Sequence, residues 1–289
     1  MLRPLHVPAL IALAVALAAL VPAEAEDGIG FGRAALTPRQ DAVLSGTLTA
    51  VRRISRQGST PVCIFDLDAT LFEAGCRHKA IFGELAREYR RAYPGMAAIV
   101  APWVPDDLPY AVTDMFTMAG ILAKDERARA FAFWKQRFFS NEYLRFDHPV
   151  SGGVAFVNAL SKAGAIIVYL TGREEAKMQD GTVATLKAVG YPLGPGRGEL
   201  LMASRSGVAD DHFKGSPEVQ QTIGALGTIV AIFDNEPGNC NALRKSFPGA
   251  LTVLLDTNHS PGAPPPDIGI PVIKNFRWSW LPGATSGLD

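Results

Sequence analysis

The sequence predicts a three-layer α/β fold built on a parallel sheet, and three observations lead to it. Short runs rich in Val, Ile and Leu recur along the chain, and these runs are continuous instead of alternating with polar residues. Continuous runs are typical of strands buried on both faces, as in parallel sheets. Helix-like stretches separate the runs, and this βαβ alternation puts helices on both faces. The 289 residues, 48% hydrophobic and 19% charged, have the composition of a globular chain.

The elements follow one another in a regular order. A helix over 38–56 comes first and is expected to pack outside the sheet. The expected strands are 62–68, 165–171, 199–203, 228–234 and 250–256. The helices expected between them are 151–162, 174–189, 217–226 and 236–246. The Pro-rich segment 260–271 is expected to be a surface loop, since it is too short to link domains.

One long segment interrupts the alternation directly after the first strand. Residues 72–149 contain no convincing strand, only helix-like pieces over 74–93, 110–122 and 123–140. The pattern therefore predicts an inserted helical lid.

The N-terminus reads as a secretory signal peptide. Arg3 precedes an apolar run over 7–21, and Ala23-Glu24-Ala25 forms a small-x-small cleavage site. The alternative is a membrane anchor, but the run falls short of the ~20 residues that a spanning helix needs. We expect cleavage after Ala25 and export, to a periplasm or beyond.

Charge and cysteine content exclude some classes of partner and leave one question open. Lys+Arg 28 against Asp+Glu 28 gives a net charge of +0, whereas nucleic-acid and anionic-membrane binding need a basic excess. We therefore expect neither partner for the mature protein. Cys63 lies within an apolar run and is expected to be buried. Whether Cys76 and Cys240 form a disulfide stays open, as does the oligomeric state.

The stretch that ends the first strand carries two carboxylates. Asp66 and Asp68 are two residues apart, so they would point to the same side if the strand stayed extended. They lie at the carboxyl end of the strand, where open α/β sheets bind ligands. Two nearby carboxylates repel and need a metal, a proton or a cation. The alternative interpretation is a pair of solvated turn aspartates.

Other strand ends favour a functional site. Thr171-Gly172 supplies a hydroxyl and a residue that allows a ligand close to the backbone. Lys214 comes just before an expected helix start, capped by Ser216. Asp234 ends the fourth expected strand. Each residue alone has an ordinary explanation, but their joint position at strand ends favours a site.

This order of motifs resembles the haloacid dehalogenase-like superfamily, whose members carry D-x-D-x-T, then Ser/Thr, Lys and an acidic metal site. The matching residues are Asp66, Asp68 and Thr70, then Thr171, Lys214 and Asp234. The resemblance implies a Rossmann-like core over 26–71 and 150–289, after a signal peptide over 1–25. It also implies that 72–149 forms a helical cap.

The resemblance further implies a Mg²⁺-dependent phosphatase acting on a small phosphorylated substrate. Asp66 would be the nucleophile and Asp68 the general acid and base. Thr171, Gly172 and Lys214 would bind phosphate. The metal ligands would be Asp66, the backbone carbonyl of Asp68, and Asp234.

The fourth motif departs from the superfamily pattern. Relatives usually carry a second Asp there, whereas this chain has Asn235 adjacent to Asp234 and Asn239 five positions on. Asn239 could hold a metal-bound water, and Glu236 is the alternative ligand. The second metal contact is therefore left open.

The residue at position 68 favours one reaction type. Within the superfamily, dehalogenases lack this Asp and ATP-driven pumps carry Thr there, so Asp68 favours phosphatase or phosphotransferase activity. The sequence does not separate these two. A non-catalytic protein that binds a phosphorylated ligand is the rival of another class, although no motif residue has been lost.

Aromatic residues concentrate near the end of the inserted segment. They could stack on an aryl group or nucleobase, but we favour a structural role because large aromatics dominate small helical cores. Arg137, His148 and Arg173 are candidate substrate contacts. The aromatic residues are Phe131, Phe133, Trp134, Phe138, Phe139, Tyr143 and Phe146.

We expect the mature protein to begin at Glu26. Intact-mass measurement of native protein from membrane and soluble fractions tests this start, since cleavage removes a defined mass. A full-length N-terminus in the membrane fraction would contradict it.

Overall fold

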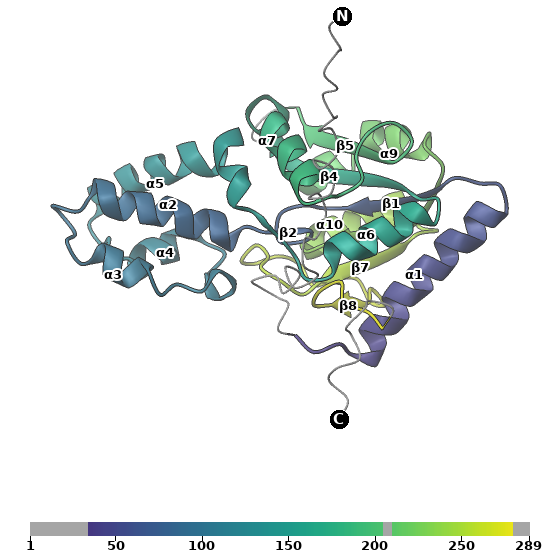
Figure 1. Ribbon diagram of the computed structural model, residues 1–289, viewed down its shortest axis with the longest axis horizontal. Coiled ribbons are helices and arrows are strands. Elements are labelled where there is room, and N and C mark those ends of the chain that lie inside the picture. The colour runs from purple at the N-terminus through teal and green to yellow at the C-terminus, as the bar shows by residue number, and fades with distance from the viewer. Residues whose placement is uncertain (1–33, 205–209, 280–289) are drawn as a thin grey trace, which may run out of the picture.

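The computed structural model describes residues 34–204 and 210–279, and the expected signal peptide lies outside them. Within this part, one sheet has the strand order β5-β4-β1-β6-β7-β8, and every neighbouring pair is parallel (Figure 1). The central strand β1 therefore lies between strands that come much later in the chain. The strands are β1 (Pro61–Phe65), β4 (Ile166–Glu174), β5 (Gly198–Ala203), β6 (Thr228–Asp234), β7 (Leu251–Leu255) and β8 (Val272–Ile273).

Both faces of the sheet are buried under helices. Side chains such as Phe65 and Phe233 pack on one face with α1, α6 and α7. The alternate residues, such as Ile64 and Ile232, pack on the other face with α9 and α10. The predicted three-layer, Rossmann-like α/β fold is thereby confirmed. The helices are α1 (Pro38–Arg56), α6 (Gly153–Lys162), α7 (Glu175–Ala188), α8 (Asp210–Lys214), α9 (Pro217–Gly224) and α10 (Pro237–Ser246).

The first helix begins and ends where the sequence predicts. The hydroxyl of Thr37 accepts a hydrogen bond from the backbone N–H of Gln40, and Pro38 occupies the first helical position. The apolar side chains of α1, including Leu44 and Val51, are buried in the core on one face of the sheet.

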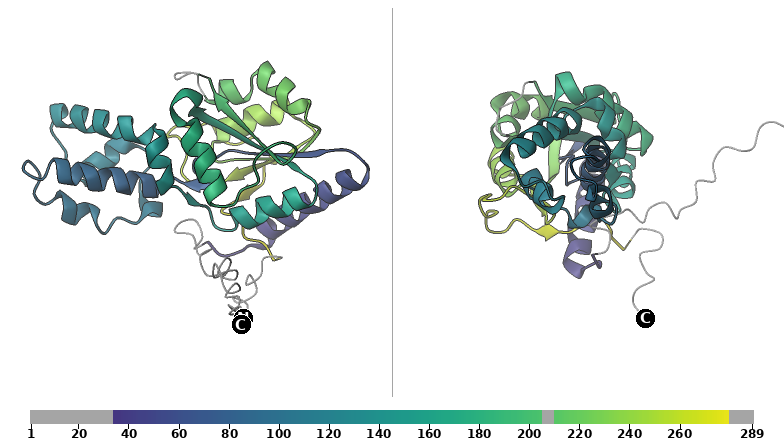
Figure 2. Two further views of the ribbon diagram at one scale, coloured as in Figure 1. Left: turned by 45° about the horizontal axis from the view of Figure 1, so that its top comes forward. Right: turned by 90° about the vertical axis from the view of Figure 1, so that its left-hand side faces the viewer.

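A helical insertion, residues 75–146, lies beside the sheet instead of on either face (Figures 1 and 2). It has its own apolar core, in which Phe82 packs between Trp103 and Phe116. None of the helices in 34–204 and 210–279 is long and apolar enough to cross a bilayer. The insertion contains α2 (Gly75–Glu88), α3 (Met96–Val100), α4 (Val112–Met118), α5 (Lys124–Phe138) and the 3₁₀ helices η3 (Pro105–Asp107) and η4 (Asn141–Phe146).

Three expectations about strands were wrong. Strand β4 runs to Glu174, three residues past the expected end at 171. Strand β1 ends at Phe65 instead of residue 68, because the chain turns around the carbonyl of Leu67, which accepts hydrogen bonds from the N–H groups of Leu71 and Phe72. Ala69 in this turn has a φ of 59°, in the left-handed region. The segment 72–149, expected to lack strands, begins and ends with the antiparallel pair β2 (Phe72–Glu73) and β3 (His148–Pro149).

The β2–β3 pair forms a tightly packed neck between the sheet and the insertion. A Cβ atom at Gly75 would lie 2.3 Å from the backbone oxygen of Pro105, so this close approach needs glycine. Glu73 is 3% exposed; one carboxylate oxygen accepts a hydrogen bond from the N–H of Gly75 (2.9 Å), and the other is buried without a partner. Burial raises the pKa of Glu73 to about 7.

We predict that Glu73 makes the protein less stable as the pH rises. Between its ordinary pKa of 4.5 and about 7, the folded protein binds a proton that the unfolded chain releases, so the free energy of unfolding falls across this range. The loss should approach about 3 kcal/mol above pH 7. Glu73→Gln stays neutral, so its advantage over the wild type should grow by about this amount between pH 4.5 and pH 8 in urea unfolding. Parallel stability–pH curves would contradict the prediction.

Candidate active site

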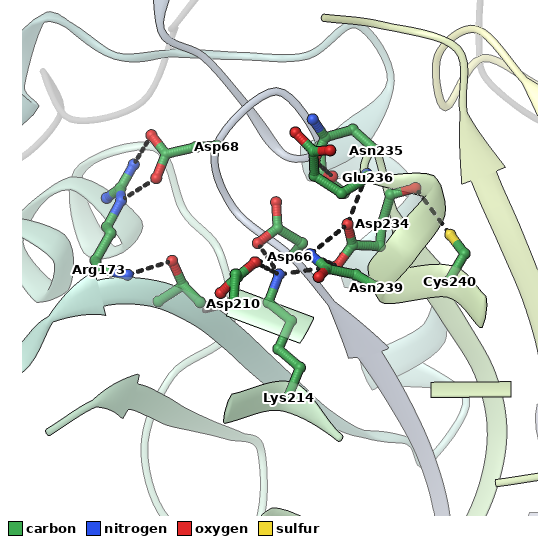
Figure 3. A network of polar contacts seen from close by, with 12 residues as sticks. Asp66, Asp68, Arg173, Asp210, Lys214, Asp234, Asn235, Glu236, Asn239 and Cys240 are labelled. Carbon is green, nitrogen blue, oxygen red and sulfur yellow. Dashed lines mark hydrogen bonds and ion pairs between the residues drawn. The ribbon is translucent and has the colours of Figure 1, made fainter. Parts of the chain in front are cut away.

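The predicted site residues from separate strands meet around one buried lysine (Figure 3). The ammonium nitrogen of Lys214, at the end of α8, lies 2.7 Å from Asp66 and 2.8 Å from Asp234. It also lies 3.0 Å from Asp210, one turn earlier in the same helix. Lys214 is 1% exposed, so a nearly dry cation binds three carboxylates.

Backbone geometry holds the first and fourth motifs together. The N–H of Asp66 donates to the carbonyl of Phe233 (2.9 Å), which continues the pairing of β1 with β6 one residue past the strand end. Asp66 and Asp234 are thus brought to the same edge of the sheet. The hydroxyl of Thr70 donates to the side-chain oxygen of Asn235 (3.3 Å) and adds a second link.

Asp68 belongs to a second charge cluster, separate from that of Asp66 (Figure 3). Its carboxylate accepts two hydrogen bonds from Arg173 (2.7 and 2.9 Å) and one from Arg77 (2.7 Å). Both arginines also bind the fully buried Asp147. The expectation that Asp66 and Asp68 point together along an extended strand is therefore wrong: the turn after Phe65 directs the two carboxylates to different cations.

The two clusters shift the pKa values of Asp66 and Asp68 in opposite directions. Burial and the neighbouring Asp234 raise the pKa of Asp66 to about 8, against the opposing effect of Lys214. Burial acts in the same direction on Asp68, but Arg173 and Arg77 outweigh it and hold the pKa of Asp68 well below its usual range. Burial alone would lower the pKa of Lys214, but its three carboxylate partners raise it well above the ordinary value.

Thr171 and Gly172 lie at the same edge of the sheet. Both line a cavity with Asp66 and Asp68, and the Thr171 hydroxyl accepts a weak hydrogen bond from the N–H of Arg173 (3.3 Å). A Cβ atom at position 172 would lie 2.3 Å from a carboxylate oxygen of Asp210. A larger residue at position 172 would therefore require the Asp210 carboxylate beside Lys214 to shift.

The residues of the fourth motif have separate partners. The side-chain nitrogen of Asn239 donates to Asp234 (3.2 Å) and to Asp210 (2.7 Å), so Asn239 lies within the lysine cluster. The Glu236 carboxylate instead accepts hydrogen bonds from the N–H and the hydroxyl of Ser260 (2.9 and 3.0 Å). Of the two alternatives for the second metal contact, Asn239 has its side chain bound to Asp234, whereas Glu236 bonds Asp234 only through its backbone N–H (2.8 Å).

The donor atoms near Lys214 fit a hard divalent cation such as Mg²⁺. Asp66, Asp210 and Asp234 carry three negative charges against the single positive charge of Lys214, which leaves a formal charge of −2. Carboxylate and amide oxygens are the ligands that Mg²⁺ prefers. In residues 34–204 and 210–279, no three His, Cys, Asp or Glu side chains by themselves form a metal site. Backbone, amide or water oxygens would have to complete the ligand set.

A cavity of about 580 Å³ extends from these residues toward the insertion. The aromatic residues expected to be structural divide between two roles. Tyr143 packs in the insertion core, as favoured, and Trp134 does so while also lining the cavity. Phe138 and Phe139 line the cavity too, and Phe139 is 42% exposed.

Of the three candidate substrate contacts, only Arg173 lines the cavity. Arg137 forms an ion pair with Glu84 (3.0 Å), and His148 is an exposed residue of β3. The cysteines Cys63, Cys76 and Cys240 are all free thiols, which answers the open question about a disulfide.

Sequence reasoning missed Asp210, Arg77 and Asp147. Asp210 could have been found, because an acid four residues before Lys214 is the spacing of an ion pair on a helix. Arg77 and Asp147 are 70 residues apart, and no local pattern links them.

Comparisons with known proteins give fold-level likenesses only. No family model and no curated protein sequence matches the chain. Solved structures similar to it include a haloacid dehalogenase-like family hydrolase from Streptococcus pneumoniae (15% identity, TM-score 0.43, covering 69% of this chain and 85% of that one). Two others are a HAD-superfamily hydrolase from Ehrlichia chaffeensis (12%, 0.41, 74% and 91%) and a HAD family hydrolase from Deinococcus radiodurans with bound phosphate and sodium (17%, 0.40, 72% and 84%). At these identities and TM-scores the likeness assigns no activity, and the function has to be inferred from the residues of this chain.

Proposed function

We propose that the protein is a haloacid dehalogenase-like phosphatase that hydrolyses a phosphomonoester through an aspartyl-phosphate on Asp66. The observation that carries this proposal is the bond of Lys214 to both Asp66 and Asp234 (2.7 and 2.8 Å). These three residues come from distant parts of the chain, and each matches one motif in the expected order. A structural ion pair would not require the accompanying hydroxyl of Thr171 on the wall of the same cavity.

In the first half of the reaction, Asp66 attacks phosphorus in line with the ester oxygen. The Asp66 O–P bond forms, the P–O ester bond breaks, and the departing oxygen takes a proton from Asp68. Thr171 and Lys214 would hold phosphoryl oxygens as charge moves between them. Mg²⁺, bound by Asp66, the carbonyl of Asp68, Asp234 and an oxygen from Asn239, would neutralise negative charge on the phosphate and the carboxylates.

In the second half, water attacks phosphorus and Asp68 accepts its proton. The P–O bond to Asp66 breaks and releases inorganic phosphate. Arg77 and Arg173 favour the ionised form of Asp68, which is the form that this half-reaction needs. The proton-donating form of the first half-reaction is the less stable one in this arrangement.

The helical insertion is proposed to act as the cap of this site. Its residues Trp134, Phe138 and Phe139 line the cavity that the strand ends open into, so a bound ester would contact both parts. Tyr110 of the insertion also bonds Ser260, which in turn bonds Glu236 (both 3.0 Å). We further propose that the phosphatase acts after export, following the signal peptide expected over 1–25.

Two rival functions remain open to the same test. A phosphotransferase would share the intermediate and pass the phosphoryl group to an acceptor hydroxyl, whereas a binding protein would show no turnover. Purified mature protein should be assayed on a panel of phosphomonoesters with Mg²⁺ and with EDTA. Phosphate release that needs Mg²⁺ and is unaffected by added alcohols supports hydrolysis. Phosphoryl transfer to the alcohols favours the first rival, and binding without turnover favours the second.

Asn substitutions should separate the roles of Asp66 and Asp68. Asp66→Asn removes the nucleophile, so phospho-enzyme formation and turnover should vanish together. Asp68→Asn should slow both half-reactions, roughly 10²- to 10⁴-fold, but least for esters with very acidic leaving groups. Rapid-quench kinetics with aryl phosphates of graded leaving-group pKa measures this.

Arg77 and Arg173 keep Asp147 as a partner in Asp68→Asn, so we expect the variant to fold, which thermal unfolding checks. If the rate of phospho-enzyme formation fell equally for every leaving group, the result would argue against the role given to Asp68.

Variants of the fourth motif should identify the metal ligands. Asp234→Ala should weaken Mg²⁺ binding by at least about tenfold, since it removes one charge of the site. Asn239→Asp should tighten Mg²⁺ binding if Asn239 contributes to the site, because it adds a charge beside the cation. Glu236→Gln should change little, because Glu236 is bound to Ser260.

Calorimetric titration of Mg²⁺ into each variant gives the affinities independently of turnover. Wild-type Mg²⁺ affinity in Asp234→Ala would overturn the metal assignment. Weak binding in Glu236→Gln, with no effect of Asn239→Asp, would move the second contact to Glu236.

A further inference from the structure

The cavity that contains the proposed phosphate site has a second region of different chemistry. Beyond the strand ends, the lining is made largely of apolar side chains from the insertion. The whole cavity has a volume of about 580 Å³, which leaves room for a ring system next to a phosphoryl group. These side chains include Leu108, Tyr110, Met115, Trp134, Phe138 and Phe139.

The positively charged side chains among the described lining residues are already paired with carboxylates. Among the described lining residues, the arginines are Arg77 and Arg173, and both are bound to Asp68 and Asp147. His78 also lines the cavity, but its Nδ1 accepts a hydrogen bond from the indole N–H of Trp134 (3.0 Å). A ring nitrogen that accepts carries no proton, so the imidazole of His78 is neutral in this arrangement. No uncommitted cation in this part of the structure is therefore available for a second anionic group of a ligand.

Phe139 is the residue that most clearly lacks a structural explanation. Its ring packs by its edge against Phe138 and Trp134, with centroids 5.0 and 5.7 Å apart, yet 42% of the residue is exposed. It sits directly after α5 and lines the cavity instead of the insertion core. When an apolar ligand covers a large exposed ring at a cavity wall, the burial of apolar surface favours binding.

We propose that the substrate is a phosphomonoester whose alcohol portion carries an aromatic ring and no second anionic group. The ring lies against the wall formed by Trp134, Phe138 and Phe139 while the phosphoryl group meets Asp66. This inference rests on the proposed function, because it takes the strand-end residues as the phosphate site. It assigns to Phe139 a role in choosing the substrate, separate from the bond-breaking step.

Non-hydrolysable phosphonates test the inference without requiring turnover. Calorimetry with Mg²⁺ present should show 2-phenylethylphosphonate binding about tenfold or more tighter than ethylphosphonate, because a phenyl ring is buried. The dianionic group is the same in both probes, so their ratio isolates the ring. 3-Phosphonopropionate, which adds a carboxylate, should bind no better than ethylphosphonate.

Phe139 and Phe131 provide a matched pair of variants. Both are about equally exposed (42% and 41%), and both rings contact Trp134 at similar centroid distances (5.7 and 5.6 Å), but Phe131 does not line the cavity. Phe139→Ala should reduce the phenylethyl-to-ethyl ratio about three- to tenfold. Phe139→Leu, which keeps an apolar side chain, should give an intermediate ratio, and Phe131→Ala should keep the wild-type ratio.

Equal affinity for the two phosphonates, tighter binding of 3-phosphonopropionate, or equal losses in Phe131→Ala and Phe139→Ala would each overturn the inference. A turnover assay with 2-phenylethyl phosphate and ethyl phosphate then tests the proposed function separately, since both esters release primary alcohols of similar pKa. Turnover of both esters at equal kcat/KM would retain the phosphatase and reject the ring preference. Ring-dependent phosphonate binding without any turnover would retain the preference and reject hydrolysis.

Discussion

The burial of the Lys214 ammonium is the constraint on which the arrangement of the site depends. An ammonium that is 1% exposed loses most of its hydration, and only nearby carboxylates can compensate for this loss. They come from three parts of the fold: Asp66 after β1, Asp234 at the end of β6 and Asp210 at the start of α8. Each of them offsets part of the cost of burying this ammonium, so the strand ends and α8 depend on one another for their positions.

Under the proposed function, the same cluster would favour a cation and a phosphate together. Three carboxylates exceed the charge of one lysine, and burial makes the excess unfavourable, as the raised pKa of Asp66 indicates. A divalent cation would relieve this excess, and a dianionic phosphate would then meet a site close to neutrality. Asp68 is kept out of this balance, because Arg77 and Arg173 neutralise it separately. Two aspartates that are two residues apart can therefore have different chemical roles.

The sequence was informative wherever a residue's role followed from its place along one strand or helix. The bounds of α1 and β6 were predicted because capping residues and continuous apolar runs mark them locally. Asp66 and Asp234 were predicted to meet because parallel strands end at a common edge, whereas Lys214 was predicted from its place before a helix and from the order of the motifs. The turn after Phe65 was missed, since its left-handed residue is Ala69 instead of the glycine that usually signals one. The cluster of Arg77, Arg173 and Asp147 was missed because it joins the insertion to the core across long stretches of sequence.

The Arg77–Asp147 ion pair helps to connect the insertion to the core. Arg77 lies in the first turn of α2 and Asp147 directly before β3, so their ion pair closes the insertion at its base next to the neck. Arg173 comes from the core strand β4 and binds the same Asp147, which ties this base to the sheet. Asp68 accepts hydrogen bonds from both arginines, so its carboxylate contacts residues of both the insertion and the core. Phe138, which lines the cavity, also contacts Arg77, whose guanidinium is 4.4 Å from the centre of that ring. The group assigned to proton transfer is thus linked through one arginine to the wall proposed to recognise the substrate.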